Sequence, residues 1–299
     1  MLPARLIALL VGSCCAALSV SSCSTTADAH DARLQVAAAF APLAEIAQQV
    51  GGGAVHVATI VPPGDDAHEY DPTPKQITGL ANADVVLYLG HGFQPNIEKA
   101  ISTLPGATPT IDLYHGIALI PAGDGIDPHA WLDPKNMVTM TNATAAALSA
   151  ARPADAAAFR ANADAYIVQL DALDHELATG LGTCAERTLV SSHRSYAYLA
   201  KAYGLTQASI AGISPGEEPS AKQLLAISRY VRTHHVSTIF FDDNLPSDLA
   251  TTVAQEAGAT TAVLDPIETI SKDQLQRHET YLSLMRENLA TLRKGLGCT

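Results

Sequence analysis

Three histidines of this chain lie in short loops, and each loop follows a run of β-forming residues. His68 lies in Val-Pro-Pro-Gly-Asp-Asp-Ala-His-Glu-Tyr-Asp-Pro (61–72), His129 lies in Asp-Pro-His-Ala-Trp-Leu-Asp-Pro (127–134), and His193 ends Thr-Leu-Val-Ser-Ser-His (188–193). Ligands of open α/β sheets bind just beyond the carboxyl ends of the strands. Three imidazoles that converge there would bind a borderline-soft divalent metal ion, above all zinc. Most single histidines are ordinary hydrogen-bonding residues, so the prediction depends on the shared loop position.

Strands that alternate with helices position these loops. In the first half, strands are expected at 34–40, 55–61, 84–90 and 109–114, and helices at 41–50, 74–83 and 96–104. The second half has the same pattern, with strands at 188–192, 206–211, 236–241 and 261–264 and helices at 196–203, 220–235, 247–257 and 279–296. The alternation predicts an α/β fold with two mostly parallel sheets. The halves share this architecture, but no close internal sequence repeat is apparent.

The segment between the two halves has no strand signals. Pro153 divides it into two helices, and apolar residues recur at three- and four-residue spacing along the second, at Phe159, Ala163, Tyr166, Leu170, Leu173 and Leu177. This spacing places them on one helical face. A helix over 154–180 would be about 40 Å long at about 1.5 Å per residue, which is enough to run along both halves.

The N-terminal segment is typical of an export signal. Arg5 precedes the apolar run Leu6–Val11, and small residues follow as far as Val-Ser-Ser-Cys (20–23). The apolar run is well short of the about 20 residues of a membrane span, so residues 1–22 are predicted to be a cleaved signal peptide. The ending resembles a bacterial lipobox, which implies cleavage before Cys23 and a lipid on its sulfur. An ordinary secretory signal is the alternative.

Composition limits the classes of partner. The formal net charge is −12 and the chain has no cluster of Lys or Arg, which argues against nucleic acid. An acidic surface suits a protein that collects cations outside the cytoplasm, or it serves solubility alone. Of the five cysteines, Cys14 and Cys15 leave with the signal and Cys23 would carry the lipid. The remaining pair, Cys184 and Cys298, is predicted to form a disulfide in an oxidising compartment.

Several motifs together resemble the metal-specific substrate-binding proteins of bacterial ABC transporters, which include zinc- and manganese-binding lipoproteins. The matching stretches are His-Glu-Tyr-Asp-Pro-Thr-Pro (68–74), Ala-Asp-Val-Val-Leu-Tyr-Leu-Gly (83–90), Asp-Pro-His-Ala-Trp-Leu-Asp-Pro (127–134), Ser-His-Arg-Ser-Tyr-Ala-Tyr-Leu-Ala-Lys-Ala-Tyr-Gly-Leu (192–205), Ile-Ser-Pro-Gly-Glu-Glu-Pro-Ser (213–220) and Tyr-Leu-Ser-Leu-Met-Arg-Glu-Asn-Leu (281–289). The resemblance implies two α/β lobes joined by one long rigid helix, with the metal in the cleft between them. It implies ligands His68 and His129 from the first lobe and His193 from the second.

The resemblance also bears on the choice of metal. Manganese members tend to have a carboxylate at the position of His193, so the histidine here favours Zn²⁺ over Mn²⁺. Many zinc members carry a long loop rich in histidines and acids. Here only Gly116–Asp127 precedes His129 and it contains no further histidine. His91 also follows a predicted strand and is a weaker candidate ligand.

A carboxylate is expected to complete the site. Three neutral histidines leave Zn²⁺ its full charge, so an anionic oxygen is the natural fourth ligand of a closed tetrahedral site. The candidates that follow strands in the second half are Asp242, Asp243, Asp265 and Glu268. We predict Glu268, which lies a few residues past its strand and can reach the cleft, and relatives place their carboxylate in this loop. Asp265 or water is the alternative, although Asp265 is expected to make backbone or capping hydrogen bonds.

The resulting hypothesis is a zinc-binding component of an ABC uptake system rather than an enzyme. It would be a monomer held outside the cell membrane by lipidated Cys23, and it would deliver Zn²⁺ to permease and ATPase subunits. The expected parts are a signal peptide (1–22), a lipidated end and tether (23–33), a first lobe (34–153), a linking helix (154–182) and a second lobe (183–299). The alternatives are a manganese-binding protein and an extracellular zinc enzyme with an open three-histidine site, although no general base is obvious. A role in cell adhesion is compatible with metal delivery.

Overall fold

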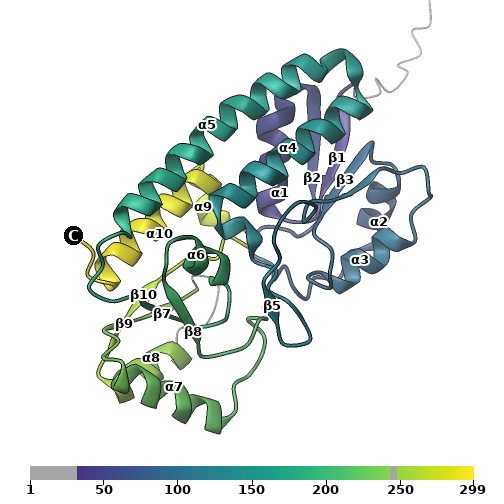
Figure 1. Cartoon of the computed structure of the whole chain (residues 1–299). Coiled ribbons are helices and arrows are strands. Elements are labelled where there is room, and N and C mark those ends of the chain that lie inside the picture. Colours follow the sequence, from purple (N-terminus) through teal and green to yellow (C-terminus); the bar gives the residue numbers. More distant parts are fainter. Residues whose placement is uncertain (1–31, 243–247) are drawn as a thin grey trace, which may run out of the picture. The chain divides into compact units, whose positions relative to one another are not determined.

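A computed structural model of the chain describes residues 32–242 and 248–299 (Figure 1). The predicted signal peptide, Cys23 and Asp243 lie outside the described residues. Residues 33–299 cluster as one unit that contains two four-stranded sheets. No helix in the described part is long and apolar enough to cross a membrane.

The first sheet is parallel throughout, with the strand order β2-β1-β3-β4. Its strands are β1 (Leu34–Ala38), β2 (Val55–Thr59), β3 (Val85–Tyr88) and β4 (Thr110–Asp112), and its helices are α1 (Ala41–Gly51), α2 (Pro74–Ala81) and α3 (Pro95–Ser102). The apolar runs of β1 and β3 are almost entirely buried, as expected for central strands of a parallel sheet.

The second sheet is also parallel, with the order β10-β9-β7-β8. Its strands are β7 (Thr188–Ser191), β8 (Thr206–Ser209), β9 (Thr238–Phe241) and β10 (Thr260–Val263), and its helices are α6 (Ala197–Ala202), α7 (Ala221–Thr233), α8 (Asp248–Ala257), α9 (Lys272–Gln276) and α10 (Tyr281–Gly295). The predicted fold class is therefore confirmed.

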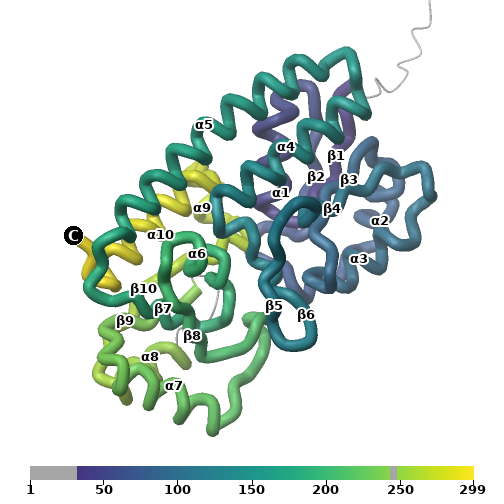
Figure 2. Tube along the Cα trace, viewed as in Figure 1, coloured from purple at the N-terminus to yellow at the C-terminus, as the bar shows by residue number. Residues whose placement is uncertain are grey.

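Two helices connect the sheets (Figures 1 and 2). The first, α4 (Pro134–Ala151), begins at Asp133, whose side chain accepts a hydrogen bond from the backbone N–H of Lys135. After the break at Pro153, α5 (Ala156–Gly180) packs against α1 and α4 on one side and against α10 beside the second sheet. Its buried residues are the six predicted from spacing alone: Phe159, Ala163, Tyr166, Leu170, Leu173 and Leu177.

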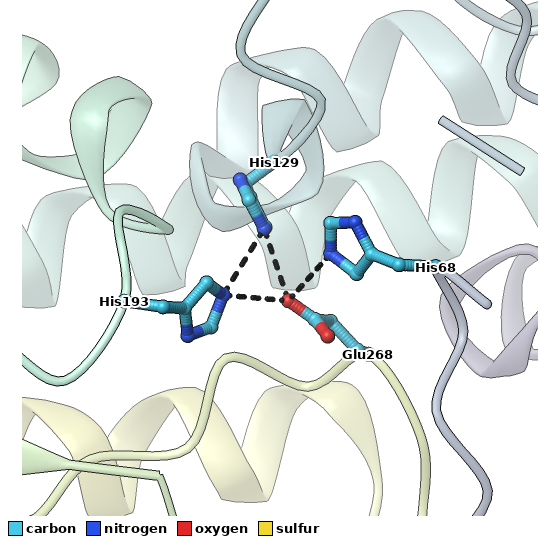
Figure 3. Close-up of side chains that lie close together, drawn as sticks. All are labelled: His68, His129, His193 and Glu268. Atoms are coloured by element: carbon cyan, nitrogen blue, oxygen red, sulfur yellow. Dashed lines mark hydrogen bonds and ion pairs between the residues drawn. The ribbon is translucent and has the colours of Figure 1, made fainter. Parts of the chain in front are cut away.

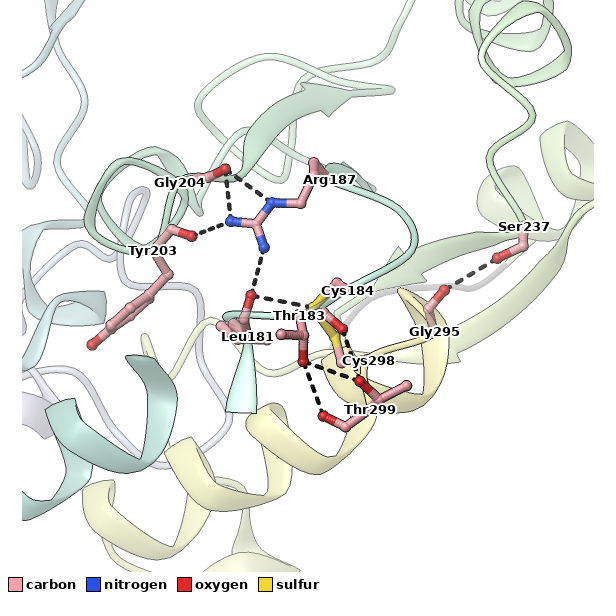
Figure 4. Close-up of a disulfide and its surroundings, with 10 residues drawn as sticks. All are labelled: Leu181, Thr183, Cys184, Arg187, Tyr203, Gly204, Ser237, Gly295, Cys298 and Thr299. Atoms are coloured by element: carbon pink, nitrogen blue, oxygen red, sulfur yellow. Dashed lines mark hydrogen bonds between the residues drawn. A yellow bond between two sulfur atoms is a disulfide. The ribbon is translucent and has the colours of Figure 1, made fainter. Parts of the chain in front are cut away.

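The predicted disulfide between Cys184 and Cys298 is present (Figure 4). It joins the chain just before β7 to the chain just after α10. Beside it, the Thr183 hydroxyl donates a hydrogen bond of 3.1 Å to the carbonyl of Thr299. Closing a loop of 114 residues stabilises the fold by about 4–5 kcal/mol in the chain-entropy model.

Some short elements were not predicted. These are the antiparallel pair β5 (Pro121–Ala122) and β6 (Gly125–Ile126), the 3-10 helices η1 (Gly52–Ala54), η2 (Ala130–Leu132) and η3 (Pro153–Asp155), and helix α9. Elements of two to five residues are too short for a hydrophobic period to develop, so the sequence carries little signal for them.

Candidate metal centre

His68 is positioned by the loop that follows β2. The Asp66 carboxylate accepts a hydrogen bond of 2.7 Å from the backbone N–H of His68, which closes a local turn. The Gln94 side chain donates to the carbonyl of Ala67 at 3.0 Å. The His68 ring also packs edge-on against Phe93, with centroids 4.9 Å apart. The hydrogen bonds to the backbone and the contact with Phe93 therefore fix the position of the imidazole.

His129 lies between the β5–β6 pair and helix η2. One oxygen of the Asp127 carboxylate contacts both the backbone nitrogen of His129 at 3.0 Å and its ring Nδ1 at 2.9 Å. The other ring nitrogen, Nε2, faces the second sheet. The imidazole is fully buried, and its ring lies 5.2 Å from that of Trp131.

His193 follows β7 directly. Its Nδ1 lies 2.7 Å from the carboxylate of Asp242, which follows the neighbouring strand β9. The hydroxyl of Ser192 donates to the same Asp242 oxygen at 2.8 Å. Because the Nδ1 atoms of both His129 and His193 face carboxylates, the Nε2 atom of each ring is the one that can bind a metal when the ring is neutral.

Glu268 completes the cluster from the loop after β10 (Figure 3). Its Oε1 atom lies 3.0 Å from Nε2 of His129, 3.1 Å from Nε2 of His193 and 3.5 Å from Nε2 of His68. The Nε2 atoms of His129 and His193 are 3.4 Å apart. Ligands at about 2.0–2.1 Å from a tetrahedral zinc ion are about 3.3–3.4 Å from each other, so these separations suit one metal ion.

The electrostatics of the cluster favour a bound cation. Burial opposes charge on His193, but the charge of Glu268 and the hydrogen bonds to Asp242 and Glu268 outweigh it and raise the pKa of His193 to about 10. Burial likewise opposes charge on His129, while hydrogen bonds to Asp127 and Glu268 raise its pKa. Burial also opposes charge on Glu268, but the charges of His68 and His193 hold its pKa well below the ordinary value.

One buried nitrogen has no hydrogen-bond partner among the described residues. Nε2 of His68 lies in this cluster, and the side chain of His68 is only 7% exposed. Oε1 of Glu268 is 3.5 Å from this nitrogen, which is too long for a good hydrogen bond, and a metal ion at the centre of the cluster would pair with it. A cavity of about 130 Å³ reaches His193 and Glu268 and is lined by Asp65, Asp66 and Asp242. The site is therefore connected to an acidic opening.

The structure brings four of the candidate ligands together and places His91 and Asp265 outside the group. His68, His129, His193 and Glu268 form the one group of side chains in the described residues that could hold a metal ion, with candidate ligand atoms within 4.8 Å of each other. Exposed His91 is outside it. Asp265 instead accepts hydrogen bonds from the backbone of Ile267 and the side chain of Gln274, each at 2.7 Å.

Two carboxylates beside the cluster contact the rings of the histidines, and the sequence did not predict this role for either of them. Asp242 is one of the candidate fourth ligands, but its carboxylate contacts Nδ1 of His193, on the side of the ring away from the cluster. Asp127 lies in the motif that contains His129 and supports that ring in the same way. A carboxylate two residues before a candidate histidine is a signal that could have identified Asp127.

The family model described as "Zinc-uptake complex component A periplasmic" matches residues 36–295. The chain belongs to this family. It is 33% identical over 304 residues to the zinc-binding lipoprotein AdcA of Streptococcus pneumoniae, a match that covers 96% of this chain and 60% of that relative. It is 30% identical over 304 residues to the high-affinity zinc uptake system protein ZnuA of Bacillus subtilis, covering 96% of this chain and 94% of that relative. The chain thus spans 56–60% of the length of the streptococcal AdcA relatives.

Solved structures have the same fold. The Zn(II)-bound ZnuA-like domain of Streptococcus pneumoniae AdcA has a TM-score of 0.79 and 33% identity, covering 88% of this chain and 99% of that chain. The laminin-binding protein Lmb of Streptococcus agalactiae, a bifunctional protein with adhesin and metal transporting activity, has a TM-score of 0.81 and 27% identity, with the same coverage of both chains. The predicted family resemblance is therefore confirmed.

Proposed function

We propose that this protein captures Zn²⁺ as the binding component of an ABC uptake system, with His68, His129, His193 and Glu268 as the ligands. The observation that carries the proposal is the set of four buried candidate ligand atoms, drawn from loops of both lobes and all within 4.8 Å of one another, with Oε1 of Glu268 3.0–3.5 Å from the three imidazole nitrogens. Three imidazole nitrogens favour zinc over manganese, which prefers oxygen ligands. The zinc-binding names of the relatives support the same choice.

Glu268 also bears on the alternative of a zinc enzyme. A catalytic zinc keeps one position open for water, whereas here a carboxylate lies in contact range of all three histidines. The family is one of uptake components rather than enzymes. A closed site suits a protein that holds an ion and gives it up to a partner.

The hand-over requires partners at a membrane. We propose that a lipid on Cys23 anchors the protein outside the cell membrane as a monomer, and that it delivers Zn²⁺ to a permease driven by ATPase subunits. In this proposal residues 34–153 and 183–299 are the two metal-binding lobes, and residues 154–182 form the rigid link. Because α5 packs against helices beside both sheets, small tilts and loop motions are expected in place of a wide hinge closure.

Competitive metal titration tests the proposal. The protein is stripped of metal with a chelator and titrated with Zn²⁺ and Mn²⁺ against a coloured indicator. One zinc ion should bind per chain, more tightly than manganese. Glu268→Gln should weaken zinc binding measurably, but less than loss of any of the three histidines. Tighter binding of manganese, or no stoichiometric zinc binding, would contradict the proposal.

A further inference from the structure

The loop that carries Glu268 is anchored to two parts of the molecule. Its first residue, Leu264, is attached to the second sheet, because its N–H donates to the carbonyl of Phe241 at the end of β9. Asp265 is then fixed in the same lobe by Asn288 of α10, whose side-chain oxygen accepts from its N–H at 2.9 Å and whose side-chain nitrogen donates to its carbonyl at 2.6 Å. Up to Asp265, the loop is therefore held by the second lobe.

From the next residue onward, the loop is held by the first lobe. The carbonyl of Pro266 accepts a hydrogen bond of 2.8 Å from the indole Nε1 of Trp131. The hydroxyl oxygen of Thr269 accepts one of 2.9 Å from the backbone N–H of Gly64. Glu268 lies between these two anchors. It follows β10 in sequence, but Pro266, two residues before it, and Thr269, directly after it, are hydrogen-bonded to the segments that carry His129 and His68.

The backbone between Pro266 and Glu268 is in an uncommon conformation. Ile267 has φ of 55°, in the left-handed region that β-branched residues rarely adopt. Such a conformation persists only where the surrounding structure determines it. Here the N–H of Ile267 donates to Asp265 and the carbonyl of Pro266 is held by Trp131. The two hydrogen bonds thus hold both the C=O and the N–H of the Pro266–Ile267 peptide, which directs the chain toward the histidines.

Trp131 is well placed to hold this carbonyl because its own side chain is enclosed by neighbouring rings. Its side chain is fully buried and packs against Phe40 and His129, with ring centroids 4.8 and 5.2 Å away. It lies two residues after His129, in helix η2. The same short helix therefore fixes the position of His129 and of the carbonyl two residues before Glu268.

We propose that Trp131 is a positioning residue for the fourth ligand: its indole N–H holds the carbonyl of Pro266 and thereby places the Glu268 carboxylate against the three histidines. This inference rests on the proposed zinc site, because it assigns a role relative to one of its ligands. It adds that the fourth ligand is set by a hydrogen bond from the opposite lobe.

Trp131→Phe tests the inference, because phenylalanine keeps an aromatic ring but has no N–H donor. Zinc affinity should fall about tenfold, the lower end of the effect of removing a group that orients a ligand. If Trp131 acts through Glu268, the same substitution in a Glu268→Gln background should change affinity by less than about twofold. Co²⁺ bound to the Trp131→Phe variant should have a visible spectrum closer to that of the Glu268→Gln variant than to that of the unmodified protein.

Tyr196→Phe is the matched control. The Tyr196 hydroxyl donates a buried hydrogen bond of 2.8 Å to the carbonyl of Leu264, so its loss also leaves one buried carbonyl of this loop unpaired but removes no contact with the first lobe. Both variants should unfold at a similarly lowered temperature, but only Trp131→Phe should alter zinc affinity and the Co²⁺ spectrum.

The outcomes separate this inference from the proposed function. If the unmodified protein binds no zinc, the proposed function fails. If it binds zinc and Glu268→Gln weakens binding, but Trp131→Phe leaves the affinity within about twofold, only the positioning role is overturned. Equal losses from Trp131→Phe with and without Glu268, or an equal loss from Tyr196→Phe, would overturn it as well.

Discussion

The two sheets of this protein are built alike but carry their candidate metal ligands at different positions. Their strand orders are equivalent, with β1, β2, β3 and β4 corresponding to β7, β8, β9 and β10. Backbone hydrogen bonds at the carboxyl ends match residue by residue: Ala39 N to Leu87 O matches Ser192 N to Phe240 O, and Ile60 N to Ala38 O matches Ile210 N to Ser191 O. By this correspondence, Phe40 occupies the position of His193, and Leu89 occupies that of Asp242.

The correspondence shows how one scaffold supports two different half-sites. In the first lobe, Phe40 packs against Phe93 and Trp131, and the loops after β2 and β4 supply His68 and His129. In the second lobe the matching position is itself the candidate ligand, His193, and the carboxylate at the matching Leu89 position supports it. The loop after β8 supplies no candidate ligand. Both lobes therefore place their candidate ligands beyond the carboxyl ends of the strands, but after different strands in each lobe.

Removal of a histidine from either half-site should have the largest effect. His68→Ala, His129→Ala and His193→Ala should each weaken zinc binding by about 100- to 1,000-fold, because a binding free energy of about 10–16 kcal/mol is shared by four ligands. Competition with a chelator measures the loss, and thermal unfolding of the metal-free variants checks that they fold. His91→Ala, at an exposed position after β3, is the control and should bind as the unmodified protein does. A loss confined to one lobe would mean that the site does not bridge the lobes.

The carboxylates behind the two histidines should have the next largest effect. Asp127→Asn and Asp242→Asn should each lower zinc affinity by about 10- to 100-fold, because each removes the charge that orients an imidazole and makes it a better ligand. The two groups also differ in origin: Asp127 shares a loop with His129, whereas Asp242 follows β9, the strand next to the one that precedes His193. Unchanged affinity in either variant would show that its histidine is oriented by packing alone.

Acidification should weaken binding in a graded way. Metal ligands must be neutral imidazoles, so protons compete with zinc below the pKa of the metal-free site. Since the pKa of His193 is about 10, the metal-free site holds a proton at pH 7.5, and zinc binding should release it. Affinity should therefore fall by about tenfold per pH unit for each proton displaced.

Calorimetry in two buffers of different ionisation enthalpy counts the released protons. Asp242→Asn should release fewer than the unmodified protein, since it removes a group that raises the pKa of His193. Zinc retention that stays flat between about pH 7.5 and 5 would mean that histidines do not dominate the site.

The smallest effects should come from a pair of matched helix caps. Thr73 begins α2 and Ser220 begins α7, each in a capping box with a glutamine three residues later and with the same backbone angles. Thr73→Ala and Ser220→Ala should each cost about 1 kcal/mol of local stability, seen as faster hydrogen exchange in the helix concerned. Zinc affinity should change by less than about twofold. A larger change from only one cap would mean that its helix is coupled to the metal.

Much of this fold could be predicted because its elements repeat a simple period. The six buried residues of α5 follow from 3.6-residue spacing, since a long helix presents the same face many times. A short repeat could not be recognised in this way. It consists of the capping boxes Pro-Thr-Pro-Lys-Gln (72–76) and Pro-Ser-Ala-Lys-Gln (219–223), and five residues are too few to identify a repeat without their structural positions.

The site was less accessible to sequence reasoning. Spacing cannot bring His68, His129 and His193 together, since their proximity depends on how two lobes pack. The family resemblance supplied that step. No local pattern indicated that the indole of Trp131 reaches Pro266, or that Asp242 faces Nδ1 of His193, because both contacts join distant segments. The domain boundaries and the ligand roles stay predictions.

The disulfide makes the second lobe a covalent ring. Cys184 and Cys298 enclose its entire sheet, together with His193 and Glu268. A protease that cut the exposed residues 216–218, before α7, would therefore leave two fragments joined as a single molecule, and they would separate only after reduction. A cut between α4 and α5 would release the first lobe from any covalent attachment to the ring. The two proposed ligands in the ring, His193 and Glu268, thus remain parts of one molecule after a break that would divide a linear chain.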